Sequence, residues 1–249
     1  MSWITWCDQL LARAQAGEVL GLWEELNKDF YQSFLYGGRW KLYLEGLGNT
    51  LAVALLALGL GLVLGMFTAM VRTFHDQQRQ ERRSIPLAVL NRVCSVYTTV
   101  IRGTPMMVQL LIMTFVIFKS SRNLVGINAG AYVAEIVRSG LMSVDRGQME
   151  AGRSLGLSYL QTMGYVIIPQ AVKNILPALG NELIALLKET SIVTVIGLRD
   201  LTKAAQLVTS KTYGGFMPLF GTALVYLAMV MALSALIGRL ERRLRANER

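Results

Sequence analysis

The chain has 249 residues, of which 53% are hydrophobic and only 16% are charged, and its formal net charge is +9. Soluble domains carry about 25% charged residues, so this composition argues against an ordinary soluble fold and favours a membrane protein. A net positive charge can indicate nucleic acid binding, an acidic membrane surface or membrane topology. The positions of the basic residues along this chain favour topology, because they lie beside the apolar stretches.

Residues 1–46 are mixed in character and predict an N-terminal interfacial segment. Trp40 and Tyr43 precede a long apolar run, a placement that suits aromatic side chains at the lipid–water boundary. The stretch 22–45 is either an amphipathic helix lying on the membrane surface or a simple tether, and we favour the surface helix.

The first predicted span is 47–71, which holds no charge over its length and is long enough to cross about 30 Å of hydrocarbon. A basic stretch follows, with four arginines against Asp76 and Glu81. A basic block after a span marks the cytoplasmic side, which places the N-terminus outside. Small residues within the span allow another helix to approach closely: Gly59, Gly61 and Gly65.

An apolar stretch broken at Gly103-Thr104-Pro105 comes next. Proline lacks an N–H and disfavours helix in the preceding residue, so we expect a helix over 85–101 along the cytoplasmic interface and a short second span over 105–118. The third span, 124–144, returns inward with Glu135 and Arg138 inside it. Such ionisable groups face a bundle interior or wet cavity, or pair with each other as i, i+3 neighbours.

The fourth and fifth spans are predicted over 171–198, running outward, and 217–238, running inward. The chain closes on RLERRLRANER, whose five arginines fall on the same side as the earlier basic block. The sequence therefore predicts an all-α integral membrane protein with five spans, N-terminus out and C-terminus in. Its parts are a transmembrane domain over 47–240, with a cytoplasmic loop at 147–168, and a basic cytoplasmic tail at 241–249.

The loop GQMEAGRSLGLSYLQTMGYVIIPQ is too polar to cross a bilayer and too apolar for a plain linker. Gly156 can end a first helix, and Ser158 can cap a second one that begins at Tyr159. The pattern predicts helix, tight turn and helix, with Pro169 entering the next span. Such a hairpin either fills a groove on a partner protein or stabilises the bundle as an interfacial element.

The sequence lacks recognisable catalytic, phosphate-binding and metal-binding motifs. The two cysteines and single histidine lack metal-ligand spacing, and there is no phosphate-binding glycine loop, Gly-x-Ser-x-Gly elbow or His-Glu-x-x-His. We expect no catalytic residues, no metal site and no enzyme. If ATP drives transport, the ATPase must be another polypeptide.

Several blocks occur in one order along the chain: LEGLGNTLAVALL, YTTVIRGTPMMVQLL, NAGAYVAEIVRSGL and MEAGRSLGLSYLQTMGYVIIPQ. Together they resemble the permeases of ABC importers with an EAA loop, in particular the polar amino acid family of histidine, glutamine, arginine and cystine type. The resemblance covers about residues 40–240 and implies a multi-pass protein of the bacterial plasma (inner) membrane.

The resemblance also implies partners. The chain would pair with a second permease chain, identical or homologous, receive a polar amino acid from an extracellular or periplasmic solute-binding protein, and bind no nucleic acid and no cofactor itself. ATP and Mg would bind the cytoplasmic ABC ATPase subunits. The loop residues that would couple to those subunits are Glu150, Ala151, Gly152, Leu155, Gly156 and Leu157.

This sequence departs from the family pattern at two places. Gly152 stands where the motif has its second alanine, and such a glycine costs roughly 0.5–1 kcal/mol of helix stability. The segment 119–130 is shorter than the family carries, which affects the outer boundary of the third span.

Transport sites lie near mid-membrane, where helices break or polar groups intrude. A zwitterionic amino acid needs a cation for its carboxylate and a carboxylate for its ammonium; structural ion pairs are the alternative role for the same residues. The leading hypothesis is a transport subunit, and the rivals are a membrane-embedded enzyme and a scaffold or assembly factor of the same fold. The candidate substrate residues are Glu135, Arg102, Gln109, Lys188, Glu189 and Thr190.

Overall fold

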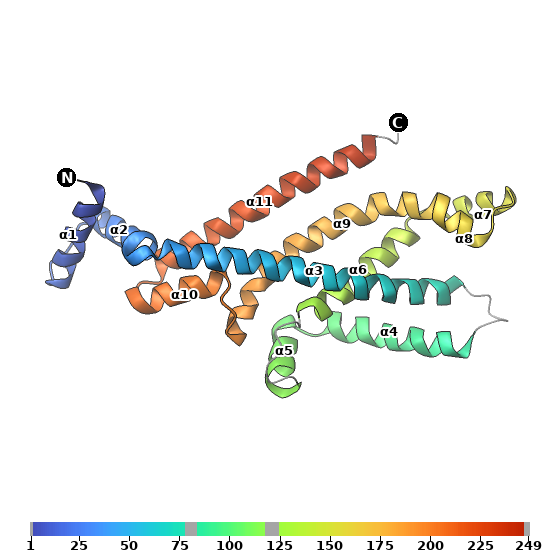
Figure 1. Cartoon of the computed structure of the whole chain (residues 1–249), viewed down its shortest axis with the longest axis horizontal. Helices are drawn as coiled ribbons and strands as arrows, with labels where there is room; N and C mark the ends of the chain where they lie inside the picture. Colours follow the sequence, from blue (N-terminus) through green and yellow to red (C-terminus); the bar gives the residue numbers. More distant parts are fainter. Residues whose placement is uncertain (1, 78–83, 118–124, 247–249) are drawn as a thin grey trace. The chain divides into compact units, whose positions relative to one another are not determined.

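The computed structural model describes residues 2–77, 84–117 and 125–246, and these form helices and connecting loops without a strand. They divide into two compact units, residues 1–52 with 190–229 and residues 53–189 with 230–249. In chain order the helices are α1 Trp3–Gln15, α2 Leu22–Phe30, α3 Trp40–Gln77, α4 Ile85–Gly103, α5 Met106–Leu111, α6 Val125–Met142, α7 Arg146–Ser154, α8 Tyr159–Thr162, α9 Ile168–Glu189, α10 Leu201–Thr212 and α11 Phe216–Ala246 (Figure 1).

Two of the described helices, α3 and α11, are long and apolar enough to cross a membrane, over Trp40–Asp76 and Phe216–Leu244. They contain the predicted first and fifth spans, and α11 continues into the predicted tail as far as Ala246. Helices α6 and α9 fall on the predicted third and fourth spans. The α-helix covers the predicted fourth span, 171–198, only as far as Glu189. A tighter 3₁₀ turn follows over Thr190–Ile196.

The predicted break at Pro105 is confirmed. Helix α4 ends at Gly103, Thr104 is extended (φ −124°, ψ 149°) and α5 begins at Met106. Thr104 takes this conformation because the proline ring excludes the helical region for the residue before it. The short α5 continues as a π-helical turn over Ile112–Ile117. Half of the short segment 119–130, residues 119–124, lies outside the described residues.

The N-terminal stretch 22–45 is not one helix, which corrects the surface-helix prediction. After α2 and a π-helical turn over Tyr31–Leu35, Gly37 and Gly38 adopt φ values of 61° and 70°. Only glycine enters this left-handed region at little cost, so the chain turns here before α3 begins at Trp40.

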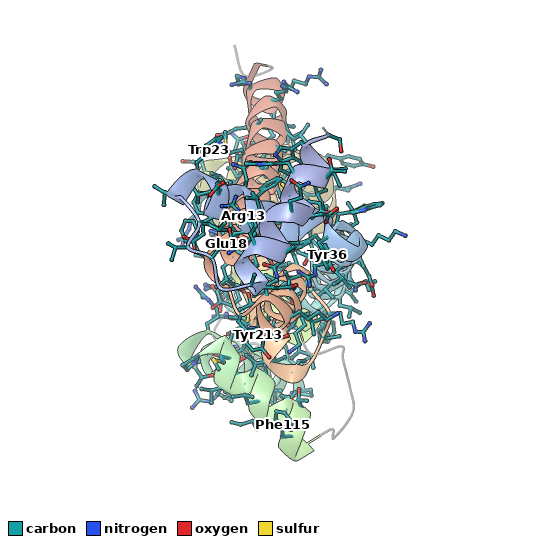
Figure 2. All side chains as sticks on the ribbon, turned by 90° about the vertical axis from the view of Figure 1, so that its left-hand side faces the viewer. Arg13, Glu18, Trp23, Tyr36, Phe115 and Tyr213 are labelled. Atoms are coloured by element: carbon teal, nitrogen blue, oxygen red, sulfur yellow. The ribbon has the colours of Figure 1, made fainter. Side chains whose placement is uncertain are left out.

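Helix α1 was not predicted, and it packs on α2. Cys7 and Leu10 are buried, and the Trp3 ring lies edge-on to Tyr31 with centroids 5.8 Å apart. Arg13, which Figure 2 shows next to Glu18, forms an ion pair with it at 2.7 Å and a second with Glu24 at 3.0 Å. The N-terminus is therefore a folded helical pair.

Close packing of α3 against α6 positions the polar groups of the second unit. A Cβ atom at Gly61 would lie 2.8 Å from Ala129 Cβ, and one at Gly65 would lie 2.5 Å from Val133 Cγ1. The predicted role of these two glycines is thus confirmed. Gly59 has open space around it within the described part of this chain, so its predicted role stays a prediction.

Candidate functional site

The first helix of the 147–168 hairpin ends in a Schellman turn. The N–H of Leu157 donates to the carbonyl of Gly152 at 3.2 Å, and the N–H of Gly156 donates to the carbonyl of Arg153 at 3.0 Å. These bonds satisfy helix-end carbonyls and require a left-handed residue between them. Gly156 is that residue, with φ 85°, which confirms its predicted role.

The second helix of the hairpin begins with a capping box at Ser158. The Ser158 hydroxyl accepts from the N–H of Gln161 at 3.4 Å, and Gln161 Oε1 accepts from the N–H of Ser158 at 2.8 Å. This reciprocal pair satisfies two donors at the start of α8. The predicted cap is therefore present, and Pro169 follows in the first turn of α9.

The hairpin presents apolar and charged side chains to solvent. Leu155 and Leu160 are 83% and 71% exposed, and Glu150 and Ala151 are exposed as well. Exposed leucines on a compact hairpin are suited to a partner groove. Of the predicted coupling residues only Gly152 is buried, and Leu157 is partly so.

Behind this surface lies a cavity of about 490 Å³, between the hairpin and the ends of α3 and α6. Its lining includes Asp76, Arg138, Glu150, Arg153 and Tyr159, and burial raises the pKa of the Tyr159 phenol. The Asp76–Arg138 ion pair, at 3.0 Å, ties α3 to α6 at the cavity. The hairpin and the C-terminal end of α3 thus lie at the same end of this unit (Figure 1).

Glu135 takes part in an ion-pair network between three helices. It pairs with Arg72 of α3, and its other oxygen lies 3.8 Å from Arg102 of α4. Arg72 also donates to the Thr98 hydroxyl at 3.2 Å. This arrangement fits the structural alternative for Glu135, since its charge is already compensated within the unit.

Arg102 remains accessible at the end of α4. Its side chain is 46% exposed, and its guanidinium lies 5.7 Å from the centre of the Tyr132 ring. The guanidinium thus lies near an aromatic ring, and an exposed guanidinium can bind a carboxylate through two hydrogen bonds.

Gln109 forms hydrogen bonds that stabilise the break between α4 and α5. Its amide nitrogen donates to the carbonyls of Ile101 and Thr104 at 2.7 and 2.9 Å, and its oxygen accepts from Asn128 at 2.9 Å. The proline at the break removes a donor for the last carbonyls of α4, and Gln109 supplies one. These bonds give it a structural role whether or not it also meets a substrate.

The remaining candidates lie at the end of α9. Lys188 is exposed, Glu189 is partly buried, and Thr190 is fully buried at the start of the 3₁₀ turn. Glu182, a partly buried residue of α9 that lies seven positions before Glu189, was not predicted from the sequence. The spacing of seven residues between the two glutamates was the available signal, because it places them two turns apart on one helix face.

The chain is similar in sequence to a known family and to several transport proteins. Residues 61–246 match the family described as "Binding-protein-dependent transport system inner membrane component". The chain is 35% identical to the glutamine transport system permease protein GlnP of Escherichia coli (strain K12), over 82% of this chain and 93% of that protein. It is 37% identical to the arginine transport system permease protein ArtQ of Bacillus subtilis (strain 168), with the same coverage.

Solved structures show the same likeness. A crystal structure of an amino acid ABC transporter with histidines has a TM-score of 0.73 and 43% identity, covering 82% of this chain and 94% of that one. An inward-facing methionine ABC transporter, MetNI, has a TM-score of 0.69 at 21% identity, over 84% and 99%, and so shows the fold alone. On the family match and the relatives together, the chain belongs to the binding-protein-dependent inner membrane components, the permease subunits of ABC transporters.

Proposed function

We propose that this chain is the permease subunit of an ATP-driven importer of polar amino acids in the bacterial inner membrane, coupled to its ATPase subunit by the 147–168 hairpin. The observation that carries the coupling role is the hairpin itself, whose two helix ends are satisfied internally while Glu150, Leu155 and Leu160 stay exposed. Similarity to permeases named for glutamine and arginine supports the substrate class.

The proposed topology has five spans with the N-terminus outside and the C-terminus inside. The C-terminal end of α3, which precedes the basic block in the sequence, lies at the same end of the second unit as the hairpin, which is consistent with both being cytoplasmic. A second permease chain completes the pathway, and a solute-binding protein delivers the amino acid from outside. Residues 1–46 lie in the lipid–water interface, where exposed Leu22 and Trp23 contact lipid.

The proposed substrate site pairs Arg102 with the glutamates of α9. Arg102 would bind the carboxylate of the amino acid, and Glu182 with Glu189 would bind its ammonium group. Arg102 and both glutamates belong to the same compact unit, residues 53–189 with 230–249, which supports their use as one site. Glu135 then acts as a positioning residue, because its carboxylate lies 3.8 Å from the Arg102 guanidinium.

Reconstitution tests the function directly. The chain, its ATPase subunit and its solute-binding protein are placed in proteoliposomes, and ATP-dependent uptake is measured across a panel of amino acids. We expect uptake of a polar amino acid and ATP hydrolysis stimulated by the loaded binding protein. Stimulated hydrolysis without uptake of any panel member would support the scaffold instead.

The coupling role has its own test. Glu150→Lys should weaken co-purification of the ATPase subunit while leaving membrane insertion intact. Glu25→Lys, a matched charge reversal at an exposed residue of α2, should co-purify the subunit as the parent does. Equal co-purification by Glu150→Lys and the parent contradicts the docking role.

A further inference from the structure

Gly152 is buried between the two helices of the hairpin, whereas its neighbours Ala151 and Arg153 are exposed. A Cβ atom at Gly152 would lie 2.5 Å from Thr162 Cγ2 and 3.0 Å from Thr162 Oγ1. Non-bonded carbon atoms are about 3.5–4.0 Å apart at their best separation. The position that carries alanine in the family motif therefore has no room for a methyl group in this chain.

Thr162 cannot simply rotate away from such a methyl group. It is fully buried at the end of α8, and its hydroxyl donates to the carbonyl of Ser158 at 3.0 Å. A β-branched side chain in a helix has few χ1 rotamers, and this hydrogen bond fixes the one in use. The Thr162 methyl group is thereby held against Gly152.

The same glycine anchors the turn between the helices, because its carbonyl accepts the Schellman bond from Leu157. A shift of Gly152 would move the turn and the exposed residues on both sides of it, Leu155 and Leu160. The contact between α7 and α8 thus fixes the spacing of the apolar docking surface (Figure 1).

We propose, on the basis of the docking function proposed above, that Gly152 and Thr162 form a size-matched pair that shapes the hairpin to fit its ATPase subunit. Both are positioning residues and act through the exposed leucines. The glycine in place of alanine is compensated by the larger residue that faces it. Reducing that residue should permit alanine at 152.

The test uses Gly152→Ala, Thr162→Ser and the double variant in the reconstituted complex, with the ATPase subunit titrated into permease proteoliposomes. The Thr162→Ser change removes the methyl group and keeps the hydroxyl. Gly152→Ala should raise the subunit concentration for half-maximal transport about tenfold, because overpacking displaces backbone. The maximal rate should recover at saturation.

The double variant should return to within about threefold of the parent, since the closest contact is gone. Gly164→Ala is the matched control, because Gly164 in the π-helical turn after α8 has open space around it; it should titrate as the parent does. Gly152→Ala with the parent's titration, or a failure of Thr162→Ser to rescue it, would overturn the size-matched pair.

Glu150→Lys in the same titration separates this failure from failure of the docking function. If Glu150→Lys abolishes coupling and Gly152→Ala has no effect, the hairpin docks but the pair does not shape it. If neither variant changes the titration, the docking function itself is wrong.

Discussion

The 147–168 hairpin and the polar network around Glu135 differ in how far apart in the sequence their hydrogen-bonded residues lie. The bonds that shape the hairpin turn and cap join residues three to five positions apart. The Arg72–Glu135 pair joins residues 63 positions apart. Hydrogen bonds between neighbouring residues depend only on the local conformation of the chain. The network around Glu135 exists only while α3 packs on α6. The hairpin should therefore keep its shape under changes that disrupt the network, and the reverse should hold too.

The largest effect is expected from Glu135→Ala. It leaves the partly buried Arg72 without its carboxylate, and we expect a loss of about 2–3 kcal/mol, less than for a fully buried pair. Thermal unfolding in detergent measures it. The charge-reversed double variant Arg72→Glu with Glu135→Arg should recover part of the loss, and no recovery would mean that the pair is not the source.

Gly65→Ala tests the packing on which the network depends. The added methyl group would overlap Val133, and overpacking of this kind costs about 1–3 kcal/mol. Gly59→Ala is the matched control on the same helix and should be neutral or stabilising, because nothing lies near it. Equal unfolding temperatures for the two variants would contradict the close approach of α3 and α6.

Arg102→Lys tests the proposed role of Arg102 in binding the carboxylate of the amino acid. Lysine keeps the charge but loses the paired donors that grip a carboxylate, so the KM for uptake should rise about tenfold, which corresponds to 1.4 kcal/mol. Glu182→Gln should raise KM in the same way. Unchanged KM values for both variants would assign these residues to structure alone.

Gly156→Ala changes the hairpin without touching the network. A left-handed conformation costs a residue with a Cβ about 1–2 kcal/mol, so docking of the ATPase subunit should weaken while the unfolding temperature of the helices stays the same. Gly156→Asn should be milder, since asparagine tolerates this region. A lowered unfolding temperature would show that the two regions are not independent.

The smallest effect concerns the N-terminal helical pair, whose side-chain hydrogen bonds include contacts between residues 11 to 24 positions apart. The N–H of Gly21, and then Arg13, lower the pKa of Glu24. A carboxyl with a lowered pKa adds stability above its unfolded value of about 4.3, which is lost as the pH falls through the folded pKa. Carboxyl NMR titration should give a midpoint below 4.3, and Arg13→Ala should raise it. A midpoint at or above 4.3 contradicts these contacts.

The sequence predicted features that depend on neighbouring residues better than contacts between residues far apart in the chain. The break at Pro105, the Gly156 turn and the Ser158 cap depend on nearest neighbours, and all three were predicted correctly. The partner of Glu135 was not, because i, i+3 spacing suggested Arg138, while the fold brings Arg72 to Glu135 and Asp76 to Arg138.

Other misses have the same physical origin. The sequence alone indicated only the cost of Gly152 to helix stability. The role proposed for Gly152 depends on Thr162, which the fold places against it. Gly59 and Gly65 are both glycines in the same apolar stretch, and the sequence does not distinguish them. Only the contact with α6 does. Helix α1 lacks a long apolar run, and its stability comes from packing on α2.

Cross-linking from the hairpin tests the central claim most directly. Both native cysteines, Cys7 and Cys94, are buried, so a cysteine introduced at Leu155 is the accessible one. In the reconstituted complex Leu155→Cys should cross-link to the ATPase subunit, and Tyr213→Cys, at a 95% exposed residue after α10 on the proposed outer side, should not. No cross-link from Leu155→Cys in a complex that hydrolyses ATP, or an equal one from Tyr213→Cys, would contradict the coupling role of the hairpin.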